Sequence, residues 1–348
     1  MQALEQLLLG IALVAYLAAA VLYTFGLAYK RREAGRVAFV VLSVGFLAHT
    51  ASIVVRGIES GRMPLTSLFE TLVFLSWCVV LLSIVADRRY AAGAAAIILV
   101  PTAFFGTAVS VLLYEGPQTL KEELQSFWLV IHAGLSVLGY AAFTLAFAAG
   151  FFYVVQDDLL KKKYEQVRTL IHVLVVAFGT GLGMYVGYLI ADPTLFEDAA
   201  GNRVYGYSGA DWTIIASGTA IGFGASLVLG WMAARGASRP SFANRLPALH
   251  VLDRLSYHSV LFGLALLAFG IVSGSMWAKV AWGHWWEWDP KQTWALVAWV
   301  FYGGYVAARE GASWRGRKAA LIAIAGVFLI VFTFLGINLF VPGRHDFN

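Results

Sequence analysis

Tryptophan is concentrated in one short segment of this 348-residue sequence. Seven of the twelve tryptophans lie between Trp277 and Trp299, in the run WAKVAWGHWWEWDPKQTWALVAW. A single tryptophan near a membrane surface is an ordinary anchor, but seven in one segment exceed that need. Together they provide several flat apolar surfaces and indole N–H donors. The segment therefore suits a large planar ligand with a polar edge, for which haem is the obvious biological candidate.

Two histidines outside the tryptophan segment are expected on the same side of the molecule as that segment. His132 lies about five residues inside the end of an apolar run, roughly 7 Å deep at 1.5 Å per residue. His345 follows the last apolar run, near the C-terminus. Two neutral imidazoles at one depth are what six-coordinate haem iron requires. The alternative is a histidine that packs between helices and a second one in a tail.

The other histidines leave more alternatives open. His49 lies within an apolar run, where it could be a ligand or a hydrogen-bonding partner of another helix, and the hydrogen bond is the preferred interpretation. His172 and His258 each lie near the opposite end of an apolar run. They could form a second ligand pair, but histidines are common at membrane interfaces. Asp289 and Pro290 are typical of a helix cap, because the carboxylate accepts backbone N–H groups and proline fits the first turn.

The composition predicts an all-α, polytopic membrane helix bundle. Hydrophobic residues make up 60% of the chain and charged residues 13%, with a mean hydropathy of +0.74. A soluble domain carries roughly 25% charged residues. A membrane span needs about 20 apolar residues. Ten segments qualify: Leu4–Tyr29, Val37–Ile58, Ser67–Ala86, Ala91–Tyr114, Phe127–Val155, Leu170–Ala191, Trp212–Ala234, Tyr257–Trp277, Thr293–Ala308 and Ala319–Val341.

Basic residues predict how these spans are oriented. They gather in every second connection, beginning with Lys30, Arg31 and Arg32 and ending with the run from Arg309 to Lys318. The positive-inside rule then puts both termini and the tryptophan segment on the outer side. The net charge of +5 is thus explained by topology rather than by nucleic-acid binding. The expected location is the bacterial inner (cytoplasmic) membrane or its equivalent.

The chain reads as a single membrane domain, residues 1–348, that contains two distinctive parts. Residues 168–235 resemble a separate helical hairpin whose glycines allow close helix contact. Residues 277–299 form the outer tryptophan-rich segment. The one cysteine, Cys78, lies in an apolar run and cannot form an internal disulfide or a CxxC pair. Any thiol chemistry must therefore use sulfur from another molecule.

Four motifs together resemble a known family. The run WGHWWEWDPKQTWALVAWVFY is similar to the WWD signature of haem-handling proteins. Its DPK-x-TWAL continuation resembles the CcsA/ResC type of system II cytochrome c biogenesis protein rather than CcmC or CcmF. Matches are also found in SGRMPLTSLFETLVFLSW, LDRLSYHSVLFGLALLAFGIVSGSMWAKVAWG and GINLFVPGRH. They cover most of residues 45–155 and 250–348.

The resemblance implies a cytochrome c synthase (haem lyase) component. Such a protein binds haem b at the outer membrane face, and thioether bonds then form with the cysteines of a CxxCH apocytochrome c. A ResB/CcsB-type membrane subunit, a thioredoxin-like thiol reductant and membrane lipids are the implied partners. The implied haem ligands and surface are His132, His345, Trp282, Trp285, Trp286, Trp288 and Asp289.

Two departures from the family pattern leave questions open. Ala307 stands where the family usually carries a histidine, so a second, inner haem site would need another ligand, for which His258 is the nearer substitute. The hairpin 168–235 resembles an insertion relative to members with eight spans. Two other functions remain as alternatives, a haem exporter without ligation activity and a b-type electron-transfer subunit. An electron-transfer subunit needs histidine pairs at both depths of the membrane.

Overall fold

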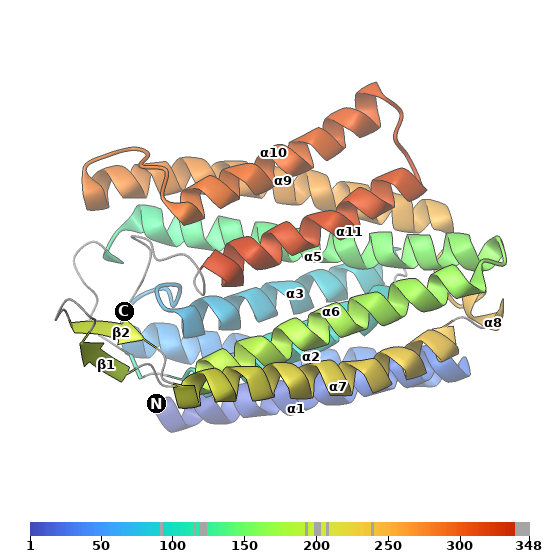
Figure 1. The fold of residues 1–348 in the computed structure, drawn as a ribbon, viewed down its shortest axis with the longest axis horizontal. Helices are drawn as coiled ribbons and strands as arrows, with labels where there is room; N and C mark the ends of the chain where they lie inside the picture. The colour runs from blue at the N-terminus through green and yellow to red at the C-terminus, as the bar shows by residue number, and fades with distance from the viewer. Residues whose placement is uncertain are drawn as a thin grey trace. The chain divides into compact units, whose positions relative to one another are not determined.

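The computed structural model describes residues 1–90, 93–114, 116–117, 124–191, 194–197, 203–206, 209–237 and 240–337. Ten long helices dominate this part of the chain (Figure 1), which confirms the predicted all-α membrane bundle. A short helix, α8 (Pro240–Ala243), and a π-helical turn, η2 (Phe332–Gly336), accompany them. The long helices are α1 (Gln2–Tyr29), α2 (Arg32–Ser60), α3 (Leu68–Tyr90), α4 (Gly93–Leu112), α5 (Phe127–Leu160), α6 (Tyr164–Ile190), α7 (Gly209–Ala237), α9 (Leu249–Trp282), α10 (Pro290–Gly311) and α11 (Arg317–Val331).

Nine of the helices in the described ranges are long and apolar enough to cross a membrane. The chain is therefore an integral membrane protein. The remaining long helix, α10, is less apolar because Lys291, Gln292, Arg309 and Glu310 fall within its 22 residues. Nine of the ten predicted spans are thus matched by such helices in the described ranges, whereas α10, which packs against α9 and α11, is not among them.

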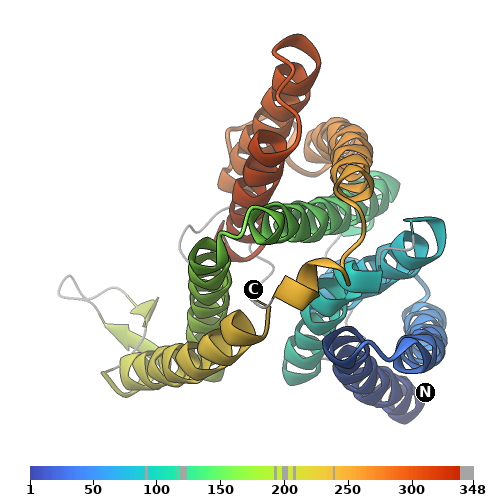
Figure 2. The same cartoon turned by 90° about the vertical axis from the view of Figure 1, so that its right-hand side faces the viewer.

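Helix α5 is the central element of the larger of two compact units, which comprises residues 1–157 and 245–348. One face of α5 joins α1–α4 in a core that includes Val137, Ala141 and Leu145. Another face joins α9, α10 and α11 in a second core that includes Tyr140 and Phe143. Figure 2 shows these two groups of helices on either side of α5. This arrangement anchors α5 along most of its length.

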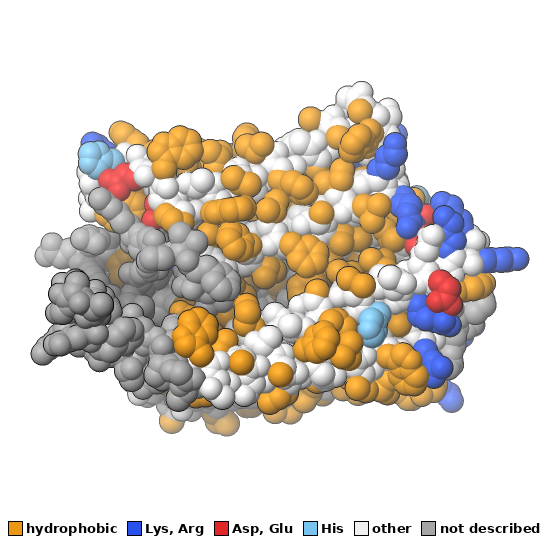
Figure 3. Space-filling view, in the orientation of Figure 1, with side chains coloured by type: hydrophobic (Ala, Val, Ile, Leu, Met, Phe, Trp, Pro, Cys, Tyr) orange, Lys and Arg blue, Asp and Glu red, His pale blue; other side chains and the backbone are white. Residues whose placement is uncertain are grey.

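The two ends of the larger unit differ in charge. Successive helices run in opposite directions (Figure 1), so the basic turns between α1 and α2, after α3, and between α10 and α11 share one end. Over α10 and α11, hydrophobic side chains cover the middle of the helices, and Lys and Arg side chains gather at the turn that joins them (Figure 3). We refer to this as the basic end. The tryptophan-rich segment lies at the opposite end, the tryptophan end.

The smaller unit, residues 158–244, is a hairpin of α6 and α7. Glycines let these helices approach closely, because a Cβ atom on Gly183 would lie 2.3 Å from the carbonyl oxygen of Gly218. A Cβ atom on Gly222 would lie 2.4 Å from the carbonyl oxygen of Gly179. The close contact predicted from the glycines is thus confirmed. Two short antiparallel strands, β1 (Thr194–Glu197) and β2 (Arg203–Gly206), pair within the connecting loop.

Candidate functional site

His132 is held in a defined orientation at the tryptophan end of α5. Its Nδ1 atom lies 2.8 Å from the carbonyl oxygen of Gly270 on α9. Because a carbonyl oxygen can only accept a hydrogen bond, Nδ1 carries the proton. The neutral ring then has its lone pair on Nε2, the atom that can ligate a metal. A hydrogen bond of this kind fixes both the tautomer and the ring direction of metal-binding histidines.

Two glycines on α9 make room for this arrangement. A Cβ atom on Gly274 would lie 2.5 Å from Nδ1 of His132, which is far closer than packing allows. A Cβ atom on Gly270 would lie 2.4 Å from Oγ of Ser136. Small residues four positions apart are the usual means by which membrane helices make such close contact. The position of the His132 ring is therefore dictated by α9 as much as by α5.

A row of aromatic rings leads from His132 into the tryptophan-rich segment. The ring of His132 is stacked with Trp277 at a centroid distance of 6.3 Å and an interplanar angle of 12°. Trp277 contacts Trp282 edge to face at 4.9 Å. Helix α9 then ends at Gly283, whose φ of 83° is readily adopted by glycine. The chain turns there and exposes the tryptophans that follow.

The exposed tryptophans provide the flat apolar surface that the sequence predicts. Trp285 is 57% exposed and Trp288 is 69% exposed. Trp286 contacts Trp288 edge to face at 5.7 Å, and its buried indole N–H group has no hydrogen-bond partner among the residues that the structure describes. A buried donor without a partner destabilises a protein. The polar edge of a bound ligand can accept the hydrogen bond of this indole N–H group. His284 lies beside these rings with an exposed side chain.

Asp289 caps α10, as predicted. Its Oδ2 atom accepts a hydrogen bond from the backbone N–H group of Lys291 at 3.0 Å, and Pro290 occupies the first turn. Oγ1 of Thr293 donates to the carbonyl oxygens of Trp288 and Asp289. Trp288 itself has a φ of 57°, a left-handed conformation that is unfavourable for a bulky residue. The cap thus holds an unfavourable backbone conformation at the centre of the tryptophan-rich segment.

These features fit a haem ligand, although only part of the expected ligand set can be located. A correctly protonated imidazole, exposed indole faces and an unpartnered donor occur together at one end of the larger unit. His345 and Arg344 lie outside the described residues. Within the described ranges, no three His, Cys, Asp or Glu side chains form a group that could hold a metal ion. Of the two haem ligands that the sequence resemblance implies, His132 is the one that lies among the described residues.

The remaining histidines occupy three different settings. His49 is completely buried, and its Nδ1 atom lies 3.0 Å from Oη of Tyr16 on α1, which confirms the preferred hydrogen bond between helices. Nδ1 of His258 lies 3.3 Å from Oη of Tyr90 in an exposed contact at the basic end. His172 packs beside Gly230 within the hairpin. The use of His258 as an inner ligand stays a prediction.

The structure also contains charged contacts that the sequence did not reveal. At the basic end, the Arg309 guanidinium binds both carboxylate oxygens of Asp253, at 2.9 and 2.5 Å. At the tryptophan end, Glu5, Arg56, Arg62 and Glu70 form a buried cluster. The signal in the sequence is that Glu5, Arg56 and Glu70 are charges inside predicted spans, Leu4–Tyr29, Val37–Ile58 and Ser67–Ala86. Such residues are rarely left unpaired in a membrane.

Together, the fold and the site define a polytopic membrane protein with an oriented histidine beside an exposed aromatic surface. The family model for the cytochrome C assembly protein matches residues 65–345, so the chain belongs to that family. It is 29% identical to the cytochrome c biogenesis protein CcsA of Prochlorococcus marinus, over 98% of this chain and 93% of that protein. It is also 30% identical to CcsA of Crocosphaera subtropica, over 84% and 82% of the two chains. The chain therefore has a role in cytochrome c assembly.

Proposed function

We propose that this protein binds haem at its tryptophan end and presents it for covalent attachment to CxxCH apocytochromes c. The observation that carries the proposal is the setting of His132. Its ring donates from Nδ1 to Gly270 and is stacked with Trp277, which leads to the exposed tryptophans. An imidazole fixed in this way is pre-organised as an axial ligand of haem iron.

Each part of the site has a distinct role in this proposal. Nε2 of His132 is one axial ligand, and His345, from the sequence resemblance, is the other. The four tryptophans of the exposed turn bind the apolar face of the porphyrin, and Asp289 fixes that turn to α10. The four are Trp282, Trp285, Trp286 and Trp288. Positioning of this kind supplies a large part of the barrier reduction in reactions between two bound partners.

The proposed reaction draws its sulfur from the substrate. Haem b supplies two vinyl groups, and a cysteine thiol of the apocytochrome adds across each vinyl double bond, so that a C–S bond forms and the thiol hydrogen ends on the neighbouring carbon. This addition needs no external oxidant. Cys78 is 0% exposed, which supports an origin of both thiols in the CxxCH motif. A thioredoxin-like reductant keeps those thiols reduced, and a ResB/CcsB-type subunit is the proposed membrane partner.

The proposal includes an orientation. The basic turns of the larger unit lie at the end opposite to the tryptophans. Under the positive-inside rule the basic end faces the cytoplasm, and the haem site faces the outer side of a bacterial inner membrane or its equivalent. The apocytochrome then meets haem after export.

A maturation assay tests this function. The protein is co-expressed with its partner subunit and a CxxCH apocytochrome, and covalent haem is detected on the product by a peroxidase stain. Wild type yields stained cytochrome, His132→Ala yields none, and added imidazole restores part of the yield because it can occupy the vacated coordination position. Normal maturation by His132→Ala refutes the assigned ligand. Haem that leaves the cell without any covalent product identifies an exporter instead.

A further inference from the structure

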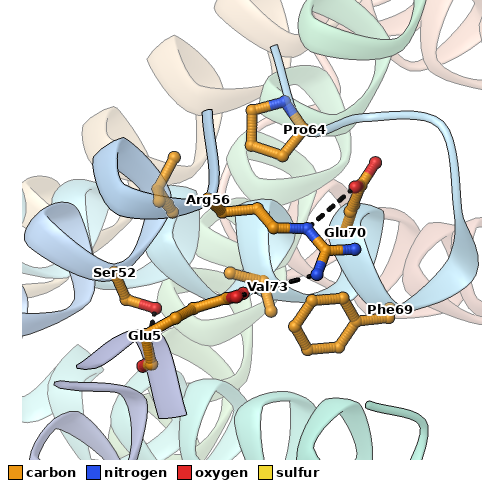
Figure 4. A pocket seen from close by; sticks show the side chains of 8 residues that line it. Glu5, Ser52, Arg56, Pro64, Phe69, Glu70 and Val73 are labelled. Atoms are coloured by element: carbon orange, nitrogen blue, oxygen red, sulfur yellow. Dashed lines mark hydrogen bonds and ion pairs between the residues drawn. The ribbon is translucent and has the colours of Figure 1, made fainter. Parts of the chain in front are cut away.

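The buried charges at the tryptophan end form one connected cluster (Figure 4). The Arg56 guanidinium lies between two carboxylates, 3.1 Å from Oε1 of Glu70 and 3.6 Å from Oε2 of Glu5. Arg62 adds a contact of 2.9 Å to Oε2 of Glu70. The side chains of Glu5, Arg56 and Glu70 are at most 4% exposed. The cavity beside them measures about 10 Å³, so the cluster itself cannot hold haem.

Stability alone is a weak reason for such a cluster. Burying ions costs several kcal/mol each, and apolar residues of similar volume often replace a buried ion pair without loss of stability. Charged contacts also fix the relative orientation of the groups that they join, because each contact has a defined geometry.

The cluster fixes the turn between α2 and α3. Beyond its two arginine partners, Glu70 accepts hydrogen bonds from the backbone N–H group of Thr66 at 2.9 Å and from its hydroxyl group at 3.0 Å. Arg62, at the other end of the turn, is bound to the same carboxylate. On the far side, the Tyr114 hydroxyl group donates to Glu5 at 3.1 Å. Burial and the nearby Glu5 carboxylate raise the pKa of Tyr114, so the phenol stays protonated as a donor.

The fixed turn lies beside α5 near His132. Leu65, which is 4% exposed, lies between Arg62 and Thr66, and a Cβ atom on Gly134 would be 3.7 Å from its Cδ1 atom. Gly134 follows His132 by two positions, which is about 200° around a helix, so the two residues face opposite directions. The first turns of α5 are thus held between α9, on the His132 side, and the α2–α3 turn, on the Gly134 side.

We propose that Glu70 and Arg56 are positioning residues for the haem ligand: they hold the α2–α3 turn against α5 and so keep His132 aligned with Gly270 and Trp277. This inference rests on the proposed function, because it assigns His132 to haem. Neither side chain touches the ligand in this account. Their effect on haem passes through Leu65 and the backbone of α5.

The test compares Glu70→Gln and Leu65→Ala with Asp253→Asn, which removes a charge from a well-paired carboxylate at the basic end. Each full-length chain is purified in detergent with its partner, and two quantities are measured. The first is haem per folded chain, with and without added imidazole. The second is the rate of amide hydrogen exchange over residues 128–135, measured on haem-free chains so that the readout does not depend on haem.

Both Glu70→Gln and Leu65→Ala are expected to speed exchange over residues 128–135 at least tenfold and to lower haem content several-fold, with partial recovery in imidazole. Asp253→Asn should leave haem per folded chain at the wild-type level and should speed exchange over residues 128–135 no more than over the rest of α5. Unchanged exchange in Leu65→Ala overturns the proposal even if Glu70→Gln fails to fold. A loss of haem that imidazole does not relieve assigns the cluster to general stability and also overturns it. If His132→Ala keeps its haem in the same experiment, the proposed function fails, and the exchange data still decide whether the cluster positions α5.

Discussion

Both ends of the larger unit contain paired charges, but they differ in the other groups that they present. At the basic end, charges are paired with each other: Arg309 binds Asp253, the backbone N–H group of Gly316 donates to the same carboxylate, and Arg317 lies 3.3 Å from Asp157. At the tryptophan end, Trp285 and Trp288 expose their rings, and the buried N–H group of Trp286 has no partner within the described part of the chain. One end is closed by contacts within the chain, whereas the other presents surfaces that suit a ligand.

The histidines at the two ends show the same difference. His132 is stacked on Trp277, and the Gly270 carbonyl group is positioned to accept a hydrogen bond from its Nδ1 atom. His258 contacts the exposed hydroxyl group of Tyr90, which can donate or accept and so does not fix a tautomer. Orientation by a fixed acceptor is the property that distinguishes a prepared metal ligand from an interfacial histidine. The tryptophan end is therefore the stronger candidate for haem.

The largest effect is expected from Gly274→Ala. The new methyl group would overlap the His132 ring, so the ring must leave its place beside Gly270. A misplacement of about 1 Å can cost a hundredfold in rate, and we expect a loss of that order in cytochrome c maturation. Gly304→Ala is the matched control, because its Cβ atom would meet nothing within 4 Å. Equal maturation by the two variants would show that the position of His132 is unimportant.

At the basic end, Asp253→Asn should affect stability rather than haem. It leaves the Arg309 guanidinium without its charged partner, and breaking a buried pair in this way costs about 3 kcal/mol. Arg309 is 8% exposed at its side chain, so solvent relieves little of that cost. Denaturant unfolding in detergent measures the loss, and haem per folded chain should not change. A selective loss of haem would show that part of the haem site lies at the basic end.

Much of the fold could be predicted from the sequence, because uninterrupted apolar runs and alternating basic turns need no partner to be recognised. Contacts between charges that are far apart in the sequence could not be predicted in this way. Helix α9 begins at Leu249 rather than at Tyr257, since Asp253 lies inside it and is paired with Arg309. The partners of Arg56 come from α1 and α3, far apart in the sequence.

The same limit applies to the site. His132 could be singled out from its depth in a span, and Asp289 with Pro290 from the chemistry of helix caps. Their surroundings could not be predicted in the same way. Gly270 and Gly274 make room for side chains of α5 only because α9 is packed against that helix. The GxxxG spacing of Gly270 and Gly274 indicates a close helix contact, but it does not identify α5 as the partner or His132 as the side chain that fills the space. The fold therefore follows from local patterns, whereas the alignment of the ligand follows from contacts between helices.

A smaller effect is expected when the cap of α10 is removed. Asp289→Ala loses one capping hydrogen bond, at a cost of about 1 kcal/mol, and loosens the turn that carries Trp286 and Trp288. Haem affinity should fall a few-fold in a titration followed by absorption. Asp289→Asn is the control, since asparagine caps helices as well as aspartate does. Weak binding by both variants would indicate that the carboxylate charge has a role beyond capping.

The smallest effect concerns backbone conformation. Trp288 and Lys30 lie at opposite ends, and both have a left-handed backbone, with φ values of 57° and 56°. Glycine relieves about 1 kcal/mol at such a position, so Lys30→Gly should raise thermal stability slightly and leave haem unchanged. Trp288→Gly should gain the same relief but bind haem less tightly. Equal haem affinity in the two variants would mean that Trp288 does not contact the ligand.

The most direct test of the account is the haem content of two variants purified in the same way, His132→Ala and His258→Ala. Each removes one imidazole, from opposite ends of the larger unit. Haem per chain is determined from the absorption spectrum and the protein concentration. We predict that His258→Ala keeps its haem with an unchanged spectrum, whereas His132→Ala loses it and regains part of it in imidazole. Haem that survives in His132→Ala and disappears in His258→Ala would contradict the assignment of haem to the tryptophan end.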